Sequence, residues 1–539
     1  MAEYDDDKDS GSDYSEKPAS YYLDKIDSAL NAPEMREWQE RCKKIRKKYR
    51  YEQSQSVKAR KYQILWSNLE VLKPAVMAKP PLPVVQRRYR DQDPVGREAC
   101  ELLERACRFQ VESNDYFSRL EHVRDDFLLY ARGVARLYYE PVMVTVEDDD
   151  DVDGLDEASM RGPDAQAQEE MQEAIEAGNP QEVLDFENVK LRFVQREDFV
   201  HEAARTWDEV SWCAFRAYLC KEELIERFGE ELARNIPLDA SPGSEDERMN
   251  NNAKPHTVES KATIWEFWDK EAQKVCWIAK GYPTVLESGA PYLKLTGFFP
   301  CPKPAFGTIT TDSLAPIPDY VYYQDQAEEI DVLTARIGAL QQALKLVGFY
   351  PGGPQGEGSP EIERALTPGF ENKMIAVKSW AAFTEGSGSK APIVWLPIEN
   401  VIVILKSCIE LRKQLIEDIY QIIGISDIMR GDGEKDETAT AQSIKAQFGS
   451  TRIRERQQEL ARFSRDITRM LAEIICSTFE PDTLLKMANM KLPTEQELFM
   501  MQQQQMLAMQ AQQAAQAQML PPQGMPPAMP PQAPMGPAI

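Results

Sequence analysis

The sequence of 539 residues is poor in the residues that many enzymes and metal sites use. It has only three histidines, His122, His201 and His256, and they lie far apart. Its nine cysteines are scattered and form no CxxC pair. This pattern favours reduced core thiols over a disulfide framework or a zinc site. A histidine-based metal site or catalytic triad within one chain is therefore not expected.

Sequence motifs of common catalysts are also missing. There is no Gly-Lys dipeptide, and hence no Walker A loop that would cradle a nucleotide phosphate. HExxH, a GxSxG elbow and a GxGxxG fingerprint in a βαβ setting are absent too. No apolar run approaches the roughly 18 residues of a membrane helix, and the acidic N-terminus does not resemble a signal peptide. We therefore expect no enzymatic activity, no cofactor and no stable membrane insertion.

The charge is unevenly distributed along the chain. The net charge is −25, of which −7 lies in residues 1–34 and −15 in residues 147–187. Both stretches have few large apolar side chains, which predicts a disordered acidic arm over 1–35 and a solvated acidic insertion over 147–187. A calcium site in the aspartate run is the less favoured alternative, because the EF-hand spacing is missing. The remaining chain is close to neutral.

One segment is strongly basic. Residues 36–61 hold eleven bases and three acids, with Trp38, Ile45, Tyr49 and Tyr62 interleaved at loosely helical spacing. Such a helix could meet nucleic acid or an acidic partner. An ordinary solvated helix face is an equally good interpretation.

The first 300 residues have the mixed pattern of an α+β body. Helices are expected within 34–78, which holds two of them, and over 95–112, 117–135 and 221–228. Proline at positions 74, 80 and 81 ends the second helix. β-rich runs predict strands over 134–146, 189–194, 210–218, 263–268, 275–278 and 293–299.

The second half contains two long helices with a regular apolar seam. The first runs from Pro318 to about Val347 and the second from about Ile398 to Ile423. Their apolar residues recur at alternating steps of three and four, as in a coiled coil. The seam comprises Ile330, Leu333, Ile337, Leu340 and Leu344 in the first helix, and Ile402, Leu405, Ile409, Ile416 and Ile419 in the second. Because 348–396 contains strand-like runs, we predict a small α/β module carried on a helical hairpin.

A polar loop follows the hairpin, and a very long helix is predicted over 438–476. Its apolar stripe is Leu460, Phe463, Ile467, Leu471 and Ile474. Residues 500–539 contain eleven Gln, eight Met and eight Pro and no charge, which is typical of a disordered tail. Thin seamed helices need neighbours to bury their faces, and a ring of identical hairpins is the economical solution.

The order of several short motifs resembles that of portal proteins, the head-to-tail connectors of tailed bacteriophages. In the second half, Pro316–Asp319 leads into a helix with Ala327–Asp331, Ile419–Asp427 closes the second helix, and Gly431 with Glu437–Ala441 opens the long one. In the first half, the motifs are Trp66–Leu69 with Pro74 and Pro80, and Trp265–Asp269 followed by Phe299-Pro300 and Pro304. The resemblance covers about residues 36–490.

The resemblance implies a division of the chain into the parts of a portal subunit. The fold would be α+β and mainly helical, with a wing, a helical-hairpin stem, a small α/β clip and a short helical crown, assembled as a ring. The implied parts are the wing at 36–315, stem helices at 316–347 and 398–428, the clip at 348–397, the tunnel loop at 429–437, a long kinked wing helix at 438–479, the crown at 480–520 and a disordered Pro/Met tail at 521–539.

The resemblance also implies sites and partners. The seam residues would join subunits, the tunnel loop would face DNA through Arg430, Asp432, Glu434, Lys435 and Asp436, and the clip would offer Glu361, Arg364, Lys373 and Trp380. Expected partners are eleven further copies in a dodecamer, the large terminase, adaptor and neck proteins, capsid and scaffolding proteins, and double-stranded DNA passing without sequence specificity. The protein would assemble in the host cytoplasm and reside at a capsid vertex of the virion.

Two alternatives remain open. The first is another ring-forming connector or scaffold whose hairpin binds a different protein. The second is a metal-dependent enzyme acting on nucleic acid, with Mg²⁺ held by Asp148–Asp151 or by the acids of Asp325–Asp331. The acids at 325–331 are equally explained by their position at a helix N-terminus, where the macrodipole favours negative charge.

Overall fold

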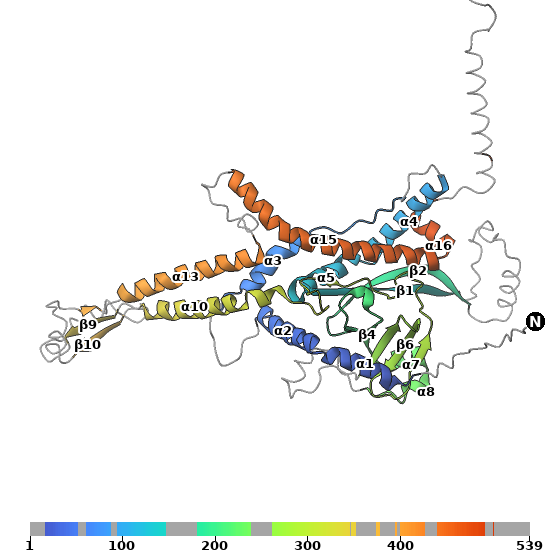
Figure 1. Ribbon diagram of the computed structural model, residues 1–539, viewed down its shortest axis with the longest axis horizontal. Helices are drawn as coiled ribbons and strands as arrows, with labels where there is room; N and C mark the ends of the chain where they lie inside the picture. The colour runs from blue at the N-terminus through green and yellow to red at the C-terminus, as the bar shows by residue number, and fades with distance from the viewer. Residues whose placement is uncertain are drawn as a thin grey trace, which may run out of the picture. The chain divides into compact units, whose positions relative to one another are not determined.

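The computed structural model has an α+β fold in which helices predominate (Figure 1). It describes residues 17–51, 61–87, 94–146, 181–238, 261–344, 347–351, 373–377, 394–395, 399–425, 439–490 and 500. The chain divides into a first unit, Met1–Phe479, and a second unit, Glu480–Ile539. In the second unit the described helix is α16 (Pro481–Ala488), which begins with a proline at its first position.

An antiparallel five-stranded sheet forms one layer of the first unit, in the order β3-β4-β5-β6-β7. The strands are β3 (Phe199–His201), β4 (Trp212–Leu219), β5 (Ala262–Asp269), β6 (Lys274–Ala279) and β7 (Glu287–Gly289). Every residue of β5 is buried, because both faces of the sheet are covered. One face packs against the core that includes Leu224 of α7 (Lys221–Phe228) and Ala233 of α8 (Glu230–Ala233).

The other face of this sheet is covered by α1 (Ala19–Asn31). Tyr22 and Ile26 of this helix are buried in one cluster with Trp212 and Phe267. The rings of Tyr22 and Phe267 lie 5.0 Å apart. The predicted disordered arm over 1–35 is therefore wrong for residues 17–35, because Ala19, Tyr22 and Ile26 recur at helical spacing and cover a face of the sheet. Residues 1–16 lie outside the described part.

A long antiparallel ribbon forms a second layer. It consists of β1 (Arg132–Val146) and β2 (Gln181–Val194), with the short β8 (Ala305–Phe306) on the far side of β1. The predicted acidic insertion over 147–187 is thus too long, since residues 181–187 belong to β2 and pair with β1 from Val146 to Pro141. A bulge skips Asp185 between the pairs Val142–Phe186 and Met143–Leu184, and the ring of Phe186 packs against Phe109 at 5.7 Å.

Helix α5 (Tyr116–Tyr130) ends earlier than the sequence predicts. Ala131 adopts a left-handed conformation with φ of 60°, and β1 then runs back over the helix. A Cβ atom on Gly133 would lie 2.4 Å from the carbonyl oxygen of Val123, so only glycine permits this approach. Residues 131–135 therefore leave the predicted helix. The predicted strand over 293–299 is also wrong, since this segment is irregular with one turn.

Long helices complete the body: α2 (Pro33–Tyr49), α3 (Ile64–Val76), α4 (Pro94–Ser113) and α15 (Ala439–Thr478). The position of α15 and its apolar stripe are confirmed, because Leu460, Phe463, Ile467, Leu471 and Ile474 are all buried. Helix α15 packs against α3, α4, β1 and β8.

The predicted hairpin is present as α10 (Gln324–Ala343) and α13 (Glu399–Ile423), which lie side by side (Figure 1). A 3₁₀ turn, η2 (Asp319–Tyr322), precedes α10. Between the helices, β9 (Val347–Pro351) pairs in parallel with β10 (Lys373–Val377) and antiparallel with β11 (Val394–Trp395). Helix α10 ends about four residues earlier than predicted. Within the described part, no helix is both long and apolar enough to cross a bilayer.

Candidate functional site

The hairpin closes its inner face within one chain. Leu333 and Ile337 of α10 and Cys408 of α13 are buried together. Four partly buried residues pack around them, namely Leu340, Leu405, Ile409 and Leu415. Burial of apolar area of this kind is the main source of stability for a helix pair. The inner seam therefore holds α10 and α13 to each other.

This placement revises the prediction for the seam. Leu333, Ile337, Leu340, Leu405 and Ile409 were expected to join neighbouring subunits, but α10 and α13 of one chain bring them together. Of the remaining seam residues, Ile330 and Ile419 are fully buried and Leu344, Ile402 and Ile416 are partly buried. The seam spacing identified the pairing surface of the helices, whereas the choice of partner was left open by the spacing itself. Contacts between subunits through these residues remain a prediction.

A different set of apolar residues lies on the outside of the hairpin. We call them the outer apolar surface: Val332, Val403, Ile404 and Leu411, which are exposed by 62%, 62%, 51% and 42%. Ile404 and Leu411 are seven residues apart and so share one face of α13. Sequence reasoning missed this set because its members fall between the seam positions. The available signal was the apolar run Val401–Leu405, which is too wide for a single seam.

Truncating a side chain of the inner seam should loosen the hairpin. Ile337→Ala removes a buried side chain and leaves a cavity, which typically costs about 2–5 kcal/mol. Amide hydrogen exchange in α10 and α13 should therefore become at least about tenfold faster. Gln414→Ala, at an exposed polar position of α13, is the control and should change the rates little. Equal amide protection in the two variants would contradict the role of the inner seam in holding α10 and α13 together.

The base of the hairpin is fixed to the body by polar contacts. Asp331 accepts a hydrogen bond of 2.9 Å from the backbone N–H of Tyr62 and lies 3.5 Å from Nζ of Lys48. Asp319 forms an ion pair with Arg456 of α15. Farther along α15, Arg462 donates to the carbonyl oxygens of Lys303 and Pro304. These contacts connect the hairpin, α2 and α15 in one framework.

Asp331→Ala should weaken this anchoring. It removes the acceptor for the N–H of Tyr62 and the partner of Lys48, a loss of about 1–3 kcal/mol for partly buried groups. The expected result is faster hydrogen exchange in the first turns of α10 and around Tyr62, with little change in β5. Asp325→Ala, at an exposed position one turn and a half earlier, is the matched control. If amide hydrogens exchange equally fast in Asp331→Ala and Asp325→Ala, the contacts of Asp331 with Tyr62 and Lys48 are not needed to anchor the hairpin.

A cavity of about 750 Å³ lies beside this junction. Its walls include Phe127, Gly307, Ile422 and the charged residues Glu455 and Arg456. Acidic and basic groups are mixed in its lining, since Arg456 is paired with Asp319 and Glu459 with Arg462. No group of three or more histidine, cysteine, aspartate or glutamate side chains in the described residues is arranged to hold a metal ion.

The acids predicted as an alternative metal site do not converge in the described structure. Asp325, Glu328 and Glu329 are exposed at the start of α10, whereas Asp331 is occupied by Lys48 and Tyr62. Asp148–Asp151 lie outside the described residues. The enzyme alternative gains no geometric support from residues 325–331.

The buried histidine has a structural setting. His201 lies between Phe199 and Trp207, with ring centroids at 5.7 Å from each. Burial and the nearby charge of Arg132 lower the pKa of His201 to about 4, so the ring is neutral at pH 7. No nucleophilic side chain is hydrogen-bonded to it among the described residues; the carbonyl oxygen of Glu202 lies 2.8 Å from its Nδ1. His201 is therefore a core residue.

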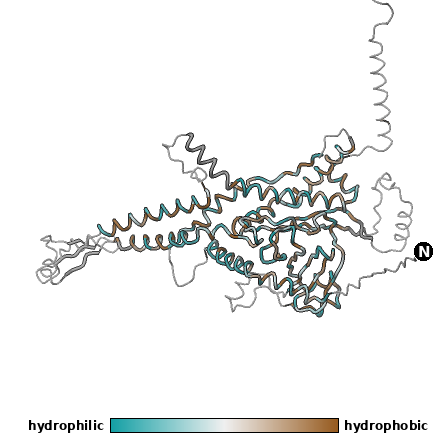
Figure 2. Tube along the Cα trace, viewed as in Figure 1, coloured by the Kyte–Doolittle hydropathy of each residue, from teal (hydrophilic) through white to brown (hydrophobic). Residues whose placement is uncertain are grey.

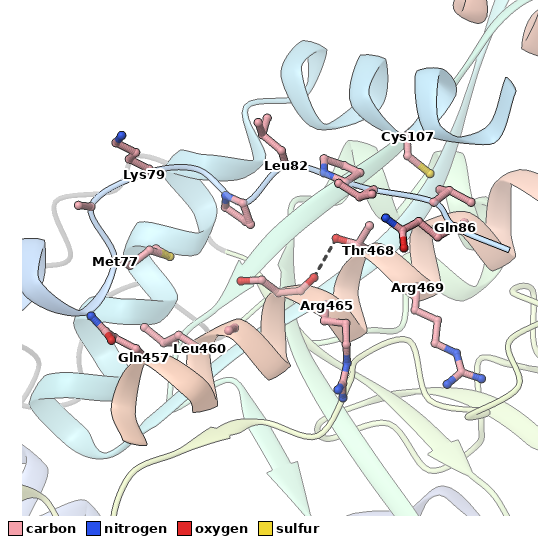
Figure 3. Close-up of a pocket in the computed structure, with 18 of the residues that line it drawn as sticks. Met77, Lys79, Leu82, Gln86, Cys107, Gln457, Leu460, Arg465, Thr468 and Arg469 are labelled. Carbon is pink, nitrogen blue, oxygen red and sulfur yellow. Dashed lines mark hydrogen bonds between the residues drawn. The ribbon is translucent and has the colours of Figure 1, made fainter. Parts of the chain in front are cut away.

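A groove of about 670 Å³ lies between α15, α4 and the extended segment 77–86 (Figure 3). Its floor is apolar or small, with Leu103, Cys107, Leu460, Ala461 and Ser464. Arg465 and Arg469 extend away from Leu82 and the rest of the extended segment (Figure 3), and they pair with Asp466 and Glu473. Among the described residues, its lining contains no histidine, aspartate or glutamate.

The remaining predicted site residues cannot be placed. All five tunnel-loop residues, Arg430, Asp432, Glu434, Lys435 and Asp436, lie outside the described part. The same holds for Glu361, Arg364 and Trp380 of the predicted clip surface. Lys373 begins β10, where the structure describes the backbone pairing with Val347.

Comparisons with known proteins add no family to this geometry. A scan against models of protein families gave no match. A search of curated proteins gave no match either. The functional interpretation therefore depends on the residues and contacts described above.

Proposed function

We propose that this chain is a non-enzymatic portal protein that forms a ring-shaped channel for double-stranded DNA. The observation that carries the proposal is the hairpin of α10 and α13. Its inner seam is closed within one chain, and its outer apolar surface has no partner in the described structure. The order of hairpin, small mixed sheet and long α15 also fits the portal plan inferred from the sequence motifs.

The outer apolar surface supports assembly with identical neighbours. Val332 lies on α10, whereas Ile404 and Leu411 lie on α13, so both helices offer apolar contacts. A copy with two different contact surfaces can bind one neighbour on each, and such heterologous contacts close into a ring when the rotation permits. Full burial of an exposed aliphatic side chain contributes about 1.5–3 kcal/mol, and these side chains, which are about half exposed, would contribute about half as much each. The stem of the ring would then consist of hairpins from neighbouring copies packed side by side.

The charge distribution is compatible with a DNA conduit. A channel has to confine a duplex without gripping it, and many phosphate contacts from Lys and Arg would hold the DNA in place. The predicted tunnel loop over 429–437 has two bases and four acids, which is mildly repulsive toward DNA. Nucleotide hydrolysis would belong to the terminase motor docked on the ring, and adaptor proteins would bind at the clip after packaging.

The proposal is tested by the mass and shape of the purified full-length protein. Native mass spectrometry should give a closed assembly of twelve chains, and electron microscopy should show a ring with a central hole about as wide as a DNA duplex. A stable monomer over the micromolar range would contradict the proposal. A closed ring without a central hole would favour a scaffold over a channel.

A further inference from the structure

Helix α2 carries a row of bases directly opposite its buried face. Trp38, Cys42 and Ile45 are almost completely buried, and Nε1 of Trp38 donates to the carbonyl oxygen of Tyr130 at 2.9 Å. At 3.6 residues per turn, the opposite side of the helix carries Arg36, Glu40, Lys43, Lys44 and Lys47. We call its four bases the basic ridge. Figure 2 shows α2 as a predominantly hydrophilic helix.

The other bases of α2 are used within the chain, whereas most of the ridge is not. Arg46 lies 3.6 Å from Glu197, Lys48 lies 3.5 Å from Asp331, and Arg41 pairs with Glu37. In the ridge, Lys43 lies 3.4 Å from Glu40. Arg36, Lys44 and Lys47 are exposed and pair with no acidic side chain in the described part of the chain. The proposed stem and channel assign no role to them.

The same chain contains a segment of complementary charge. Residues 147–180 have thirteen acids and one base, and five of the acids are consecutive at 147–151. Charge complementarity of this kind speeds encounter and selects the partner. We infer that the basic ridge binds the acidic segment 147–180 of a second copy of this chain. This inference rests on the proposed ring, in which every copy has neighbours.

Geometry favours a second copy over the same copy. The ridge lies near the base of the β1–β2 ribbon, since Arg46 contacts Glu197, three residues after β2. The acidic segment starts at the opposite end, where Val146 pairs with Gln181. The 15 residues of β1 separate the two ends by roughly 45 Å at about 3.3 Å per residue.

To reach the ridge of its own copy, the acidic segment would have to run back along most of the ribbon. Half of the segment is 17 residues, which span at most about 56–61 Å when fully extended. Contact with the ridge of the same copy would require strong extension of both halves. A neighbouring ridge closer to the tip removes that entropic cost.

An acidic peptide fits the ridge better than a DNA duplex. Glu40 stands among the four bases and Glu37 flanks them, which reduces attraction to a continuous row of phosphates. A single acidic peptide is narrower than a duplex and can place carboxylates beside Arg36, Lys44 and Lys47 without lying on Glu37 and Glu40. Binding of duplex DNA is treated below as an outcome against the inference.

The first experiment measures how tightly the basic ridge binds the acidic segment when the segment is supplied as a separate peptide. The receptor is the full-length chain with the thirteen acids of 147–180 replaced by Asn or Gln, and the probe is a fluorescent peptide of residues 145–160. Binding by anisotropy at about 50 mM salt should weaken at least about tenfold at about 300 mM. Lys44→Glu with Lys47→Glu should weaken it at least about tenfold at low salt. The matched control, Lys274→Glu with Lys280→Glu, reverses two exposed lysines on the five-stranded sheet and should bind like the parent.

The second experiment tests whether the acidic segment bound to a ridge belongs to the same copy or to a second copy of the chain. Unlabelled and ¹⁵N-labelled wild-type protein are mixed, assembled and treated with a carbodiimide that joins amines directly to carboxylates. Mass spectrometry should find Lys44 or Lys47 linked to carboxylates of 147–157 in mixed-isotope pairs. Links confined to one isotope would overturn the second-copy assignment.

Two further outcomes would overturn the inference. One is peptide binding that Lys44→Glu with Lys47→Glu leaves unchanged, and the other is a ridge that binds duplex DNA but not the peptide. The peptide assay reads a single chain, so its failure is separable from failure of the ring. A protein that binds the peptide but stays monomeric would contradict the proposed function alone.

Discussion

Ile404→Glu combined with Leu411→Glu is expected to abolish ring assembly and leave a folded monomer. Both side chains are exposed in the single chain, so the substitution creates no buried charge before assembly. In the ring they would be buried against a neighbour, and an unpaired carboxylate there costs several kcal/mol. Because the same penalty recurs at every interface of a closed ring, the loss should be complete. Native mass spectrometry should show one chain only.

The control tests whether the effect depends on where the negative charges are placed or only on their presence. Leu82→Glu combined with Val84→Glu puts the same two charges on exposed apolar residues outside the hairpin. It should assemble like the wild-type protein. Thermal unfolding of all three proteins should be similar, since no buried contact is changed. Rings of normal mass from Ile404→Glu with Leu411→Glu would show that the outer apolar surface is not an interface.

Glu266→Ala is expected to destabilise the body by about 3–5 kcal/mol, the usual cost of removing one partner of a buried ion pair. Glu266 lies in β5 and accepts from Nη1 of Arg136 at 2.5 Å, from Nε1 of Trp268 at 2.8 Å and from Oη of Tyr292 at 2.9 Å. The substitution leaves the buried guanidinium of Arg136 without its counter-ion. Denaturant unfolding followed by tryptophan fluorescence would measure the change.

An exposed ion pair gives the matched comparison. Glu230→Ala breaks the pair with Arg234 at the surface, and such pairs contribute about 0–1 kcal/mol. Glu266→Gln should fall between the two alanine variants, because the amide oxygen can still accept hydrogen bonds. A Glu266→Ala variant as stable as Glu230→Ala would contradict the importance of the network.

The same network predicts a pH dependence. Burial alone would raise the pKa of Glu266, but the charge of Arg136 and three hydrogen bonds outweigh it and lower the pKa. A carboxylate with a lowered pKa in the folded state stabilises the protein above its unfolded pKa of about 4.3. That contribution is lost as the pH falls through the lower, folded-state value. The wild-type protein should lose more stability than Glu266→Gln between pH 5 and the acid range.

Much of the secondary structure was predictable because the apolar pattern is regular. The helix over 438–476 corresponds closely to α15, and its predicted stripe is buried from Leu460 to Ile474. The helix over 398–423 and the strands over 263–268 and 275–278 were likewise confirmed. In each case the period of the apolar residues specifies the element on its own. Helix ends were less accurate where a left-handed residue such as Ala131 stops the helix.

Long-range partners were not predictable from the same pattern. Residues 17–35 looked like part of an acidic arm, yet Tyr22 and Ile26 cover the sheet formed some 200 residues later. The pairing of Arg136 with Glu266 joins β1 to β5 and has no local signature. Both contacts exist because the fold offers a complementary surface, which composition cannot reveal.

The sequence by itself determined that the chain has two seamed helices, a long helix after them and a charge concentrated in two acidic stretches. Only the tertiary structure decided that the seam closes within one chain and that Val332, Val403, Ile404 and Leu411 face outward. A heptad spacing specifies which face of a helix is apolar but not which helix covers it. That choice depends on the packing of α10 against α13. It leads us to propose subunit contacts through the outer apolar surface, while subunit contacts through the seam remain a prediction.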